Sequence, residues 1–526
     1  MVQKSAFGVW LKCLLIGAIA LGILFRVINL DRKIYWVDET FTSLWLSGYS
    51  QEEVIAQVYD CPPVNISELQ KYQQIGAEKS FADTISQLES QHPPLYYSLA
   101  RLWNQQFGDS TTNTRRLSAA ISILTIPFFY LLGRELFSSN TTGLVAAALF
   151  SVSPFHLLYA QEARQYSLWT MTIVLSSLCL LRAMRSPTQS AWGLYAASAA
   201  LSLYASVNST VLVVGYGIYS LIRESFRFNR VLLSSLAASS IGVVACVPWL
   251  IRLKEMEMNS VGWTGQDFGL FLLAGKWSAN GVRLFFDVFS FDASTPIGQV
   301  LLLAPVGLAF VLLIIYAHYH LIRHAPREVW LFVLMLILPT FLFFALPDLI
   351  AGGRRSGVPR YVIPSFLGIQ LAVAFLLSQK AIRLQCSKRV RFWRAALSGT
   401  VLSGILSCTI ISQASVWWSK GDAYSRSIVE VSSIVNSTSN PLIVSDAKVI
   451  PILSLSHRIN PSASILLVTQ PELIASLIDF RNFNSVYLFQ PSQRLKESLE
   501  QTITESEIKS LSSHRHSLLW QIVSTQ

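Results

Sequence analysis

The sequence predicts a polytopic α-helical membrane protein with about eleven transmembrane helices and a small C-terminal α/β domain. Of the 526 residues, 52% are hydrophobic and only 13% are charged, whereas a soluble protein of this size would carry about twice that charged fraction. Apolar segments long enough to cross a bilayer recur along the first 414 residues. Beyond them, short apolar runs alternate with polar stretches, which is typical of strands alternating with helices.

The candidate spans are chosen by length, because a membrane helix needs roughly 17–25 mostly apolar residues. The first apolar segment is longer than a signal-peptide core and lacks a convincing cleavage site, so we expect it to be retained as a helix. The segments 142–158 and 209–223 are short for a span. The predicted spans are 7–29, 116–137, 142–158, 164–184, 190–207, 209–223, 231–251, 297–317, 328–346, 361–380 and 394–414.

Basic residues set the predicted orientation, because short cytoplasmic loops retain Lys and Arg. Residues 92–108 carry several polar side chains, and we expect an amphipathic helix at the outer interface there. With that choice, the cationic connections all fall on the cytoplasmic side with the N-terminus. The net charge of +11 therefore reflects topology, and nucleic-acid binding is excluded. The cationic connections are Arg182/Arg185, Arg223/Arg227/Arg230, His318 to Arg327, and Lys380 to Arg394.

The predicted spans and their orientation divide the chain into two domains. Residues 1–414 form the transmembrane domain, in which residues 30–115 are a long outer loop with interfacial helices, and residues 415–526 form an extracytoplasmic α/β domain. Strands are predicted at 441–446, 464–468 and 485–490, with helical stretches around 448–456, 471–480 and 492–511. This alternation favours a parallel sheet. No G-x-G-x-x-G follows the first strand, and the six scattered cysteines form neither a disulfide framework nor a zinc motif.

The polar residues suited to chemistry gather at predicted outer helix ends. They occur in "VDE" (37–39), "QHPPLYY" (91–97), "YAQEARQYS" (159–167) and "RRSGVPRYVIP" (354–364). A transporter would more often place ionisable groups near the middle of its spans. The sequence therefore predicts one site on the extracytoplasmic face, built from four distant stretches.

These stretches resemble the family 39-type, membrane-integrated (GT-C) glycosyltransferases, which include protein O-mannosyltransferases and the aminoarabinose transferases that modify lipid A. The likeness rests on the acidic pair after the first span, H-P-P-L-Y, "GDS…RR-L-S-A", "SPFHLLYAQEARQYSL" and a late R-Y-x-x-P. It covers about 1–185 and recurs weakly near 354–380. The resemblance implies a GT-C-like fold, a polyprenyl-phosphate sugar as donor, and transfer on the non-cytoplasmic face.

Three carboxylates are the catalytic candidates. Transfer of a sugar to a hydroxyl requires a base for the hydroxyl proton and cations for the departing phosphate. By resemblance to the family's first-loop acid, Asp38 is the candidate base. Glu39 either shares this role, because neighbouring carboxylates can raise one pKa, or begins an interfacial helix. Glu162 corresponds to a second family acid, with an ion pair to an arginine such as Arg164 as the alternative.

The substrate-binding candidates surround these acids in the four stretches. His92, before a Pro-Pro pair, could bind the lipid phosphate, the acceptor or a metal, or could simply occupy a turn. Arg164 lies beside the start of a span, and Tyr166 is one helical turn from Glu162 and could orient it. The segment 252–296 either covers the site or is an ordinary interfacial helix.

The late glycine-rich loop, which precedes the predicted span 361–380, contains the remaining binding candidates. Arginine presents a planar fork that suits phosphate oxygens, so Arg354, Arg355 and Arg360 are candidate phosphate ligands, with headgroup contact as the alternative. Tyr361 belongs to the R-Y-x-x-P motif beside them.

The leading prediction is an inverting glycosyltransferase that moves a sugar from a polyprenyl-phosphate donor to an acceptor hydroxyl. The alternatives are a lipid-linked sugar translocator without transfer chemistry and a membrane-embedded binding or assembly factor. The sequence indicates no particular cofactor, and a divalent metal stays open because carboxylates and a histidine are available. The acceptor, whether protein, lipid or glycan, is not indicated. We expect an integral protein of a bacterial inner membrane.

Overall fold

The structure, a computed structural model, divides the chain into two compact units. Unit 1 comprises residues 1–30, 89–96 and 115–413, and unit 2 comprises residues 31–88, 97–114 and 414–526. The predicted covering segment 252–296 and the connection 380–394 lie partly outside the described residues. The structure describes residues 2–252, 262, 264–266, 268–289, 297–381, 387–417, 426–502, 506–511 and 518–524.

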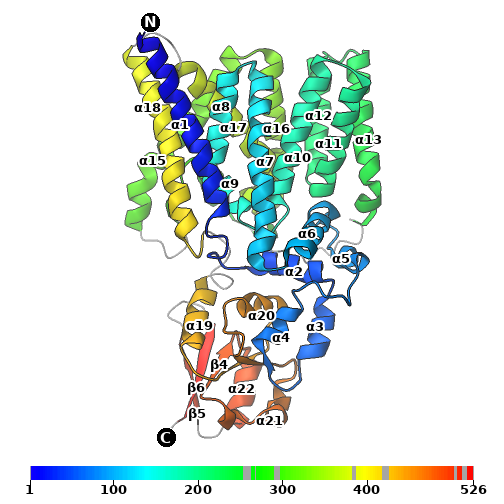
Figure 1. Ribbon diagram of the computed structural model, residues 1–526, viewed down its shortest axis with the longest axis vertical. Helices are drawn as coiled ribbons and strands as arrows, with labels where there is room; N and C mark the ends of the chain where they lie inside the picture. The colour runs from blue at the N-terminus through cyan, green and yellow to red at the C-terminus, as the bar shows by residue number, and fades with distance from the viewer. Residues whose placement is uncertain are drawn as a thin grey trace. The chain divides into compact units, whose positions relative to one another are not determined.

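Unit 1 is a bundle of long helices (Figure 1). Within the described residues, eight helices are long and apolar enough to cross a membrane, or nine with the bent pair α8–α9. The predicted spans 190–207 and 209–223 form the shorter helices α11 (Gln189–Ala205) and α12 (Ser209–Arg223), so the count of eleven is not confirmed. The eight are α1 (Val2–Val27), α7 (Thr111–Phe137), α10 (Tyr166–Arg185), α13 (Arg230–Arg252), α15 (Ile297–His324), α16 (Arg327–Ala351), α17 (Ile363–Ala381) and α18 (Lys388–Gln413).

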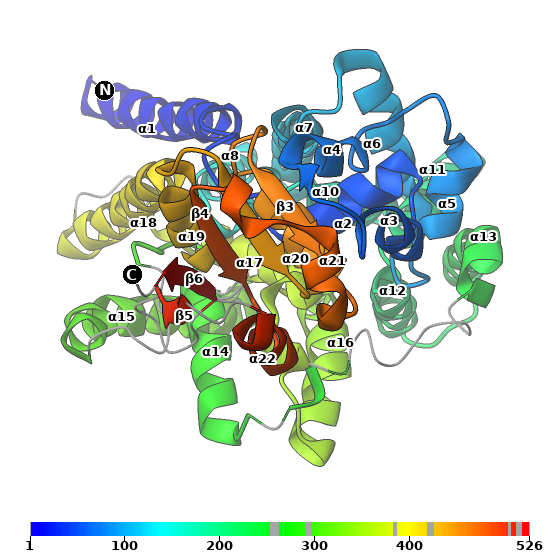
Figure 2. The same ribbon diagram turned by 90° about the horizontal axis from the view of Figure 1, so that it is seen from below.

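Two apolar spans of this bundle lie in opposite environments. In the apolar stretch of α17, 89% of the residues are buried. In that of α15 only 11% of the residues are buried, although α15 is the more apolar of the two. Figure 2 shows α17 among the other helices and α15 at the rim. Gln370 of α17 is fully buried, and at Gly368 a Cβ would meet the Ile337 side chain at 2.5 Å. Buried polar and small residues therefore distinguish the central helix from the helix at the rim.

The predicted span 142–158 is broken into α8 (Asn140–Ser151) and α9 (Pro154–Ala160), which meet at 60°. Pro154 opens α9, where its missing N–H is not needed. The carbonyl groups at the end of α8 need donors, and the buried Arg26 of α1 supplies them. Its guanidinium donates to Ser151 O at 2.5 Å and to Phe150 O at 3.2 Å.

The neighbouring helices come unusually close to this break. A Cβ at Gly22 of α1 would lie 2.4 Å from Ser151 O, and a Cβ at Gly404 of α18 would lie 2.5 Å from Val152 O. Cys408 of α18 also donates to Val152 O, at 3.3 Å. Glycine at both positions lets two helices support the broken backbone directly.

Unit 2 contains one six-stranded sheet with the order β1-β3-β2-β4-β6-β5. The predicted strands are confirmed as β2 (Pro441–Ser445), β3 (Ser464–Leu467) and β4 (Ser485–Phe489), and both β3 and β4 run parallel to β2. The edge strand β1 (Val64–Asn65) comes from the long outer loop and pairs antiparallel with β3. Part of that loop therefore folds together with the C-terminal region.

The end of the chain departs from the prediction. The helix expected over 492–511 ends early, as α22 (Gln493–Thr502), and residues 506–510 form strand β5 (Ser506–Ser510). This strand pairs antiparallel with β6 (Leu519–Ser524), which in turn pairs with β4. The prediction of helix there was wrong because pairing with β6 outweighs the local preference of a polar stretch.

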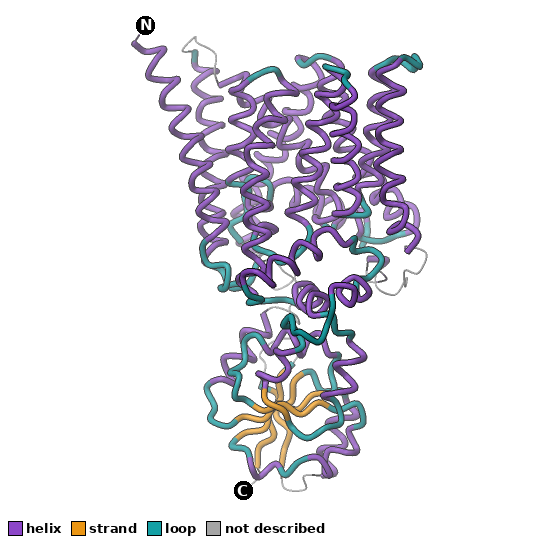
Figure 3. The backbone as a smooth tube through the Cα atoms, turned by 45° about the vertical axis from the view of Figure 1, so that its right-hand side comes forward, coloured by secondary structure: helices purple, strands orange, loops and turns teal. Residues whose placement is uncertain are grey.

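The sheet is covered on both faces, as the side-chain alternation along its strands requires (Figure 3). Ile443 and Ile465 pack with α3 (Gln51–Val58), α4 (Ile66–Lys71), α19 (Arg426–Asn436) and α20 (Val449–Ser456). Leu442 and Leu466 pack on the other face with α21 (Ile474–Leu477) and α22. Two short 3₁₀ turns, Pro471–Leu473 and Phe480–Asn482, complete this region.

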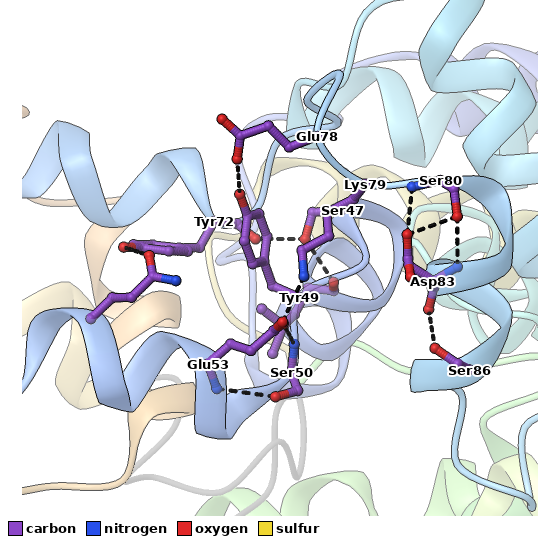
Figure 4. A network of polar contacts seen from close by, with 12 residues as sticks. Ser47, Tyr49, Ser50, Glu53, Tyr72, Glu78, Lys79, Ser80, Asp83 and Ser86 are labelled. Atoms are coloured by element: carbon purple, nitrogen blue, oxygen red, sulfur yellow. Dashed lines mark hydrogen bonds and ion pairs between the residues drawn. The ribbon is translucent and has the colours of Figure 1, made fainter.

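Polar contacts order the loop segment of unit 2 between α2 (Val37–Ser47) and α5 (Phe81–Gln87) (Figure 4). Ser50 and Glu53 form a capping box at the start of α3, and Ser80 and Asp83 form one at the start of α5. Lys79 joins the two regions through a 2.6 Å ion pair with Glu53. The predicted helix at 92–108 is confirmed as α6 (Pro94–Phe107).

Candidate functional site

His92 lies in a short turn of unit 1 ahead of α6. Its backbone N–H donates to Glu89 O at 2.8 Å, and Trp249 of α13 donates to Ser90 O at 3.0 Å. The turn is therefore fixed to a long helix. Pro93 and Pro94 follow, and the first of them restricts His92 to extended backbone conformations.

The imidazole of His92 is held between two side chains of the 159–167 stretch. Arg164 Nη2 is 3.2 Å from Nε2, and the Gln165 amide is 3.0 Å from Nδ1. A guanidinium can only donate, so Nε2 is the acceptor in the contact with Arg164. The Gln165 atom that faces Nδ1 is its amide nitrogen.

The electrostatic surroundings keep His92 neutral. Burial, followed by the charges of Arg164 and Arg360, lowers the pKa of His92 well below its ordinary value. The Glu89 carboxylate lies 3.7 Å from Nε2 and does not reverse this shift. His92, Arg164 and Arg360, predicted from three separate stretches of sequence, are therefore brought together.

The segment that carries Glu162 and Arg164 joins α9 to α10 and is buried throughout. The Gln161 side chain donates to Phe25 O at 2.7 Å and to Ile28 O at 3.0 Å, both at the end of α1. The first residue of α10, Tyr166, packs its ring edge-on against another tyrosine ring, Tyr159, at 4.9 Å. An acid and an arginine are thus placed on rigid, buried backbone rather than on a surface loop.

Asp348, near the end of α16, organises the late glycine-rich loop. One of its oxygens accepts from the N–H and the hydroxyl of Ser356, both at 2.7 Å, and the other accepts from Arg355 at 3.1 Å. Gly353 has φ +137°, and a Cβ there would lie 2.6 Å from both Asp348 Oδ1 and Arg355 Nη1. The Arg355 side chain therefore helps to build the loop.

The same loop is bound to α14 (Leu270–Val282). Trp277 donates to Ser356 Oγ at 3.0 Å, and Asn280 donates to Gly357 O at 3.1 Å. Lys276 of α14 and Arg354 of the loop both lie over the Phe268 ring, at 5.0 Å and 6.0 Å from its centroid.

Positive charge concentrates beside this contact. Burial, followed by the charges of Arg283 and Arg354, lowers the pKa of Lys276. Farther along the loop, the Arg360 guanidinium lies 5.6 Å from the centroid of the Tyr361 ring, which stacks on Phe344 at 5.3 Å. Cations gathered in this way create a field that favours an anion.

Asp38 and Glu39 lie in the first turn of α2, in unit 2, whereas the other candidates belong to unit 1. Asp38 is partly exposed and Glu39 is buried. Acidic residues suit this position because the helix N-terminus carries partial positive charge. No group of three or more His, Cys, Asp or Glu side chains placed to hold a metal occurs among the residues that the structure describes.

Gln165, Lys276 and Arg283 are site residues that the sequence reasoning did not single out. Gln165 was within a quoted motif, but its role depends on which residue it faces. Lys276 is a single lysine in the otherwise uncharged segment "LFLLAGKWSANGV", which could have marked it, because an isolated charge in an apolar helix needs a partner.

Comparisons with known proteins agree with the predicted resemblance. Residues 91–251 match the family described as dolichyl-phosphate-mannose-protein mannosyltransferase. The fold is similar to that of ArnT from Cupriavidus metallidurans bound to undecaprenyl phosphate, with TM-score 0.53 and 12% identity over 96% of this chain and 97% of that chain. For apo ArnT from the same organism the TM-score is 0.52, with 12% identity over 98% of both chains. No curated protein matches the chain.

The predicted resemblance to GT-C membrane glycosyltransferases is therefore confirmed. The chain is an integral membrane protein with a GT-C-like fold.

Proposed function

We propose that the chain is an inverting glycosyltransferase that moves a sugar from a polyprenyl-phosphate donor to an acceptor hydroxyl on the extracytoplasmic face of a bacterial inner membrane. The observation that carries this proposal is the partly buried His92 held 3.2 Å from Arg164, with the charges of Arg164 and Arg360 both near enough to lower its pKa. The undecaprenyl phosphate bound to ArnT, which has a similar fold, supports the donor class.

The cations of unit 1 provide the donor site in this proposal. Arg164, Arg354 and Arg360, together with Lys276, offer the donor groups that phosphate oxygens accept. Their mutual repulsion falls when a phosphate binds, and it falls further when the singly charged phosphodiester of the donor becomes the more highly charged phosphate of the product. His92 is a positioning residue, because its Nε2 accepts from Arg164 and fixes that guanidinium. Arg355 acts through the loop that it stabilises with Asp348.

The transfer is a single displacement. The acceptor oxygen forms a bond to the anomeric carbon from the face opposite the phosphate, while the bond from that carbon to the phosphate oxygen breaks. The electron pair of the broken bond stays on the polyprenyl phosphate. The hydroxyl proton passes to the Asp38 carboxylate, which acts as general base. Glu39 and Glu162 are the further acidic candidates, and Tyr166, one helical turn from Glu162, orients that carboxylate.

Asp38→Asn in the purified full chain, reconstituted with a panel of polyprenyl-phosphate sugars, tests the base. We expect kcat to fall by about 10²–10⁴, the usual contribution of general base catalysis, while the KM for the donor changes little. Asp31→Asn, at an exposed acid seven positions earlier, is the matched control. Full transfer by the Asp38 variant would remove the proposed base, and movement of sugar lipids across vesicles without any transfer would favour a translocator.

The face of the membrane is tested separately. Impermeant thiol reagents are applied to Asp38→Cys and Arg360→Cys in a background without native cysteines. Labelling of both positions from the extracytoplasmic side is expected, and labelling from opposite sides would rule out a common site. The same reagents applied to position 446 test the proposal that residues 415–526 form an extracytoplasmic α/β domain.

A further inference from the structure

A cavity of about 310 Å³ lies among helix ends of unit 1, and none of the candidate site residues lines it. It is bordered by the ends of α7, α10, α12 and α17 and by the start of α16. Leu181, Met184 and Phe375 contribute an apolar floor, and charged side chains including Arg185 and Arg223 also line it. These helix ends carry connections that the distribution of basic residues assigns to the cytoplasmic side.

Arg223, the last residue of α12, has an unsatisfied donor at this cavity. Its Nη1 atom is buried, and no hydrogen-bond acceptor for it occurs within the described part of the chain. The nearest carboxylate, Glu224 Oε1, is 3.7 Å away, and the other oxygen of Glu224 accepts from Asn229 at 2.6 Å. A buried, charged N–H without an acceptor is costly, so this donor indicates a bound acceptor.

The second arginine at the cavity lies in a group with excess positive charge. Arg185 Nη1 is 2.8 Å from Glu135 Oε1, and Arg182 Nε is 3.7 Å from the other oxygen of the same carboxylate. Two guanidinium groups thus share one carboxylate. Glu328, which also lines the cavity, lies in the first turn of α16, where the helix N-terminus offsets its charge.

The lining therefore combines an apolar floor with two arginines and two glutamates, Glu135 and Glu328, and Arg223 Nη1 is the buried donor without a hydrogen-bond acceptor within the described residues. A free phosphate would leave the floor uncovered, and a hydrocarbon chain would leave Arg223 without an acceptor. The volume is at the lower end of the range for small-ligand sites, roughly 300–1,000 Å³. We propose that the cavity binds a glycerophospholipid, whose phosphodiester accepts hydrogen bonds from Arg223 and Arg185 and whose first acyl carbons cover Leu181, Met184 and Phe375.

Retention of defined lipids by the purified full chain tests this site. The protein in detergent is incubated with phosphatidylethanolamine, phosphatidylglycerol, a diacylglycerol without phosphate, or inorganic phosphate, and native mass spectrometry measures what stays bound. We expect both phospholipids to be retained and the other two to be lost. Arg223→Gln should weaken phospholipid retention by about tenfold, the effect of losing a charge-assisted hydrogen bond.

Two further variants keep the result interpretable. Arg134→Gln removes an exposed arginine of α7 that does not line the cavity, and it should retain lipid like the wild type. Leu181→Trp keeps Arg223 but fills the floor, and it should lose lipid while unfolding at a temperature close to that of the wild type. Equal retention of diacylglycerol, retention of phosphate alone, or unchanged retention by Arg223→Gln would overturn the proposal. Sugar transfer is not measured, so this outcome is independent of the proposed catalytic function.

Discussion

Two regions of unit 1 contain arginine side chains with different kinds of neighbouring groups. At the break between α8 and α9, Arg26 is surrounded by oxygen acceptors: three carbonyl groups and the hydroxyl of Ser122. At the candidate site, Arg164 donates to a neutral histidine, and Arg360 contributes to lowering the pKa of that histidine. The comparison teaches that the backbone oxygens around Arg26 give it a structural role, whereas the base beside Arg164 makes that arginine a candidate anion ligand.

The physical reason for this difference is the environment of each region. The break falls inside a span, where no water is present to satisfy the carbonyl groups at the end of α8, so a side chain must do so. The candidate site lies at helix ends and loops, where several cations gather and a phosphate can bind to them. The first region needs its arginine in order to fold, and the second needs its arginines in order to bind.

Replacement of Arg26 should have the largest effect on stability. Arg26→Leu leaves the Phe150 and Ser151 carbonyl groups without their donor, and we expect a loss of about 3 kcal/mol in the free energy of unfolding. Thermal unfolding of the detergent-purified protein measures this loss. Arg26→Lys, which keeps the charge but not the fork, should lose less. An unchanged unfolding temperature for Arg26→Leu would show that the break does not depend on this side chain.

Replacement of Arg360 should separate binding from folding. Arg360→Gln removes one charged donor from the phosphate site, and the affinity for a polyprenyl-phosphate sugar should fall by roughly 2 kcal/mol, about 30-fold. The unfolding temperature should stay close to that of the wild type, because Arg26, not Arg360, donates to the carbonyl groups at the break between α8 and α9. Donor binding and thermal unfolding are measured on the same preparation. A large fall in stability with unchanged affinity would place Arg360 in the structural class.

The pH dependence of stability gives the smallest effect. Because the pKa of folded His92 is lowered, the unfolded chain takes up a proton near pH 6.5 that the folded chain does not. Stability is therefore full above about pH 6.5 and falls below it, by about 1 kcal/mol at pH 5.5 for this one group. His92→Gln should remove that part of the decline. Parallel pH profiles for the two proteins would show that His92 is not held neutral.

Much of the architecture was determined by the sequence itself. Hydropathy identified the long helices, and short continuous apolar runs identified β2, β3 and β4, because both signals depend only on neighbouring residues. The motifs around His92, Arg164 and Arg360 also pointed to residues that the structure brings together.

Other features were decided only by the tertiary structure. The break after Ser151 depends on Arg26 and Gly22, which are more than a hundred positions away in the sequence. Strand β1 forms because Val64 meets Ile465. Lys276 joins the site because α14 packs on the late loop. Each of these depends on partners distant in the sequence, and local patterns carry no information about which distant groups will satisfy a carbonyl, extend a sheet edge or surround a charge.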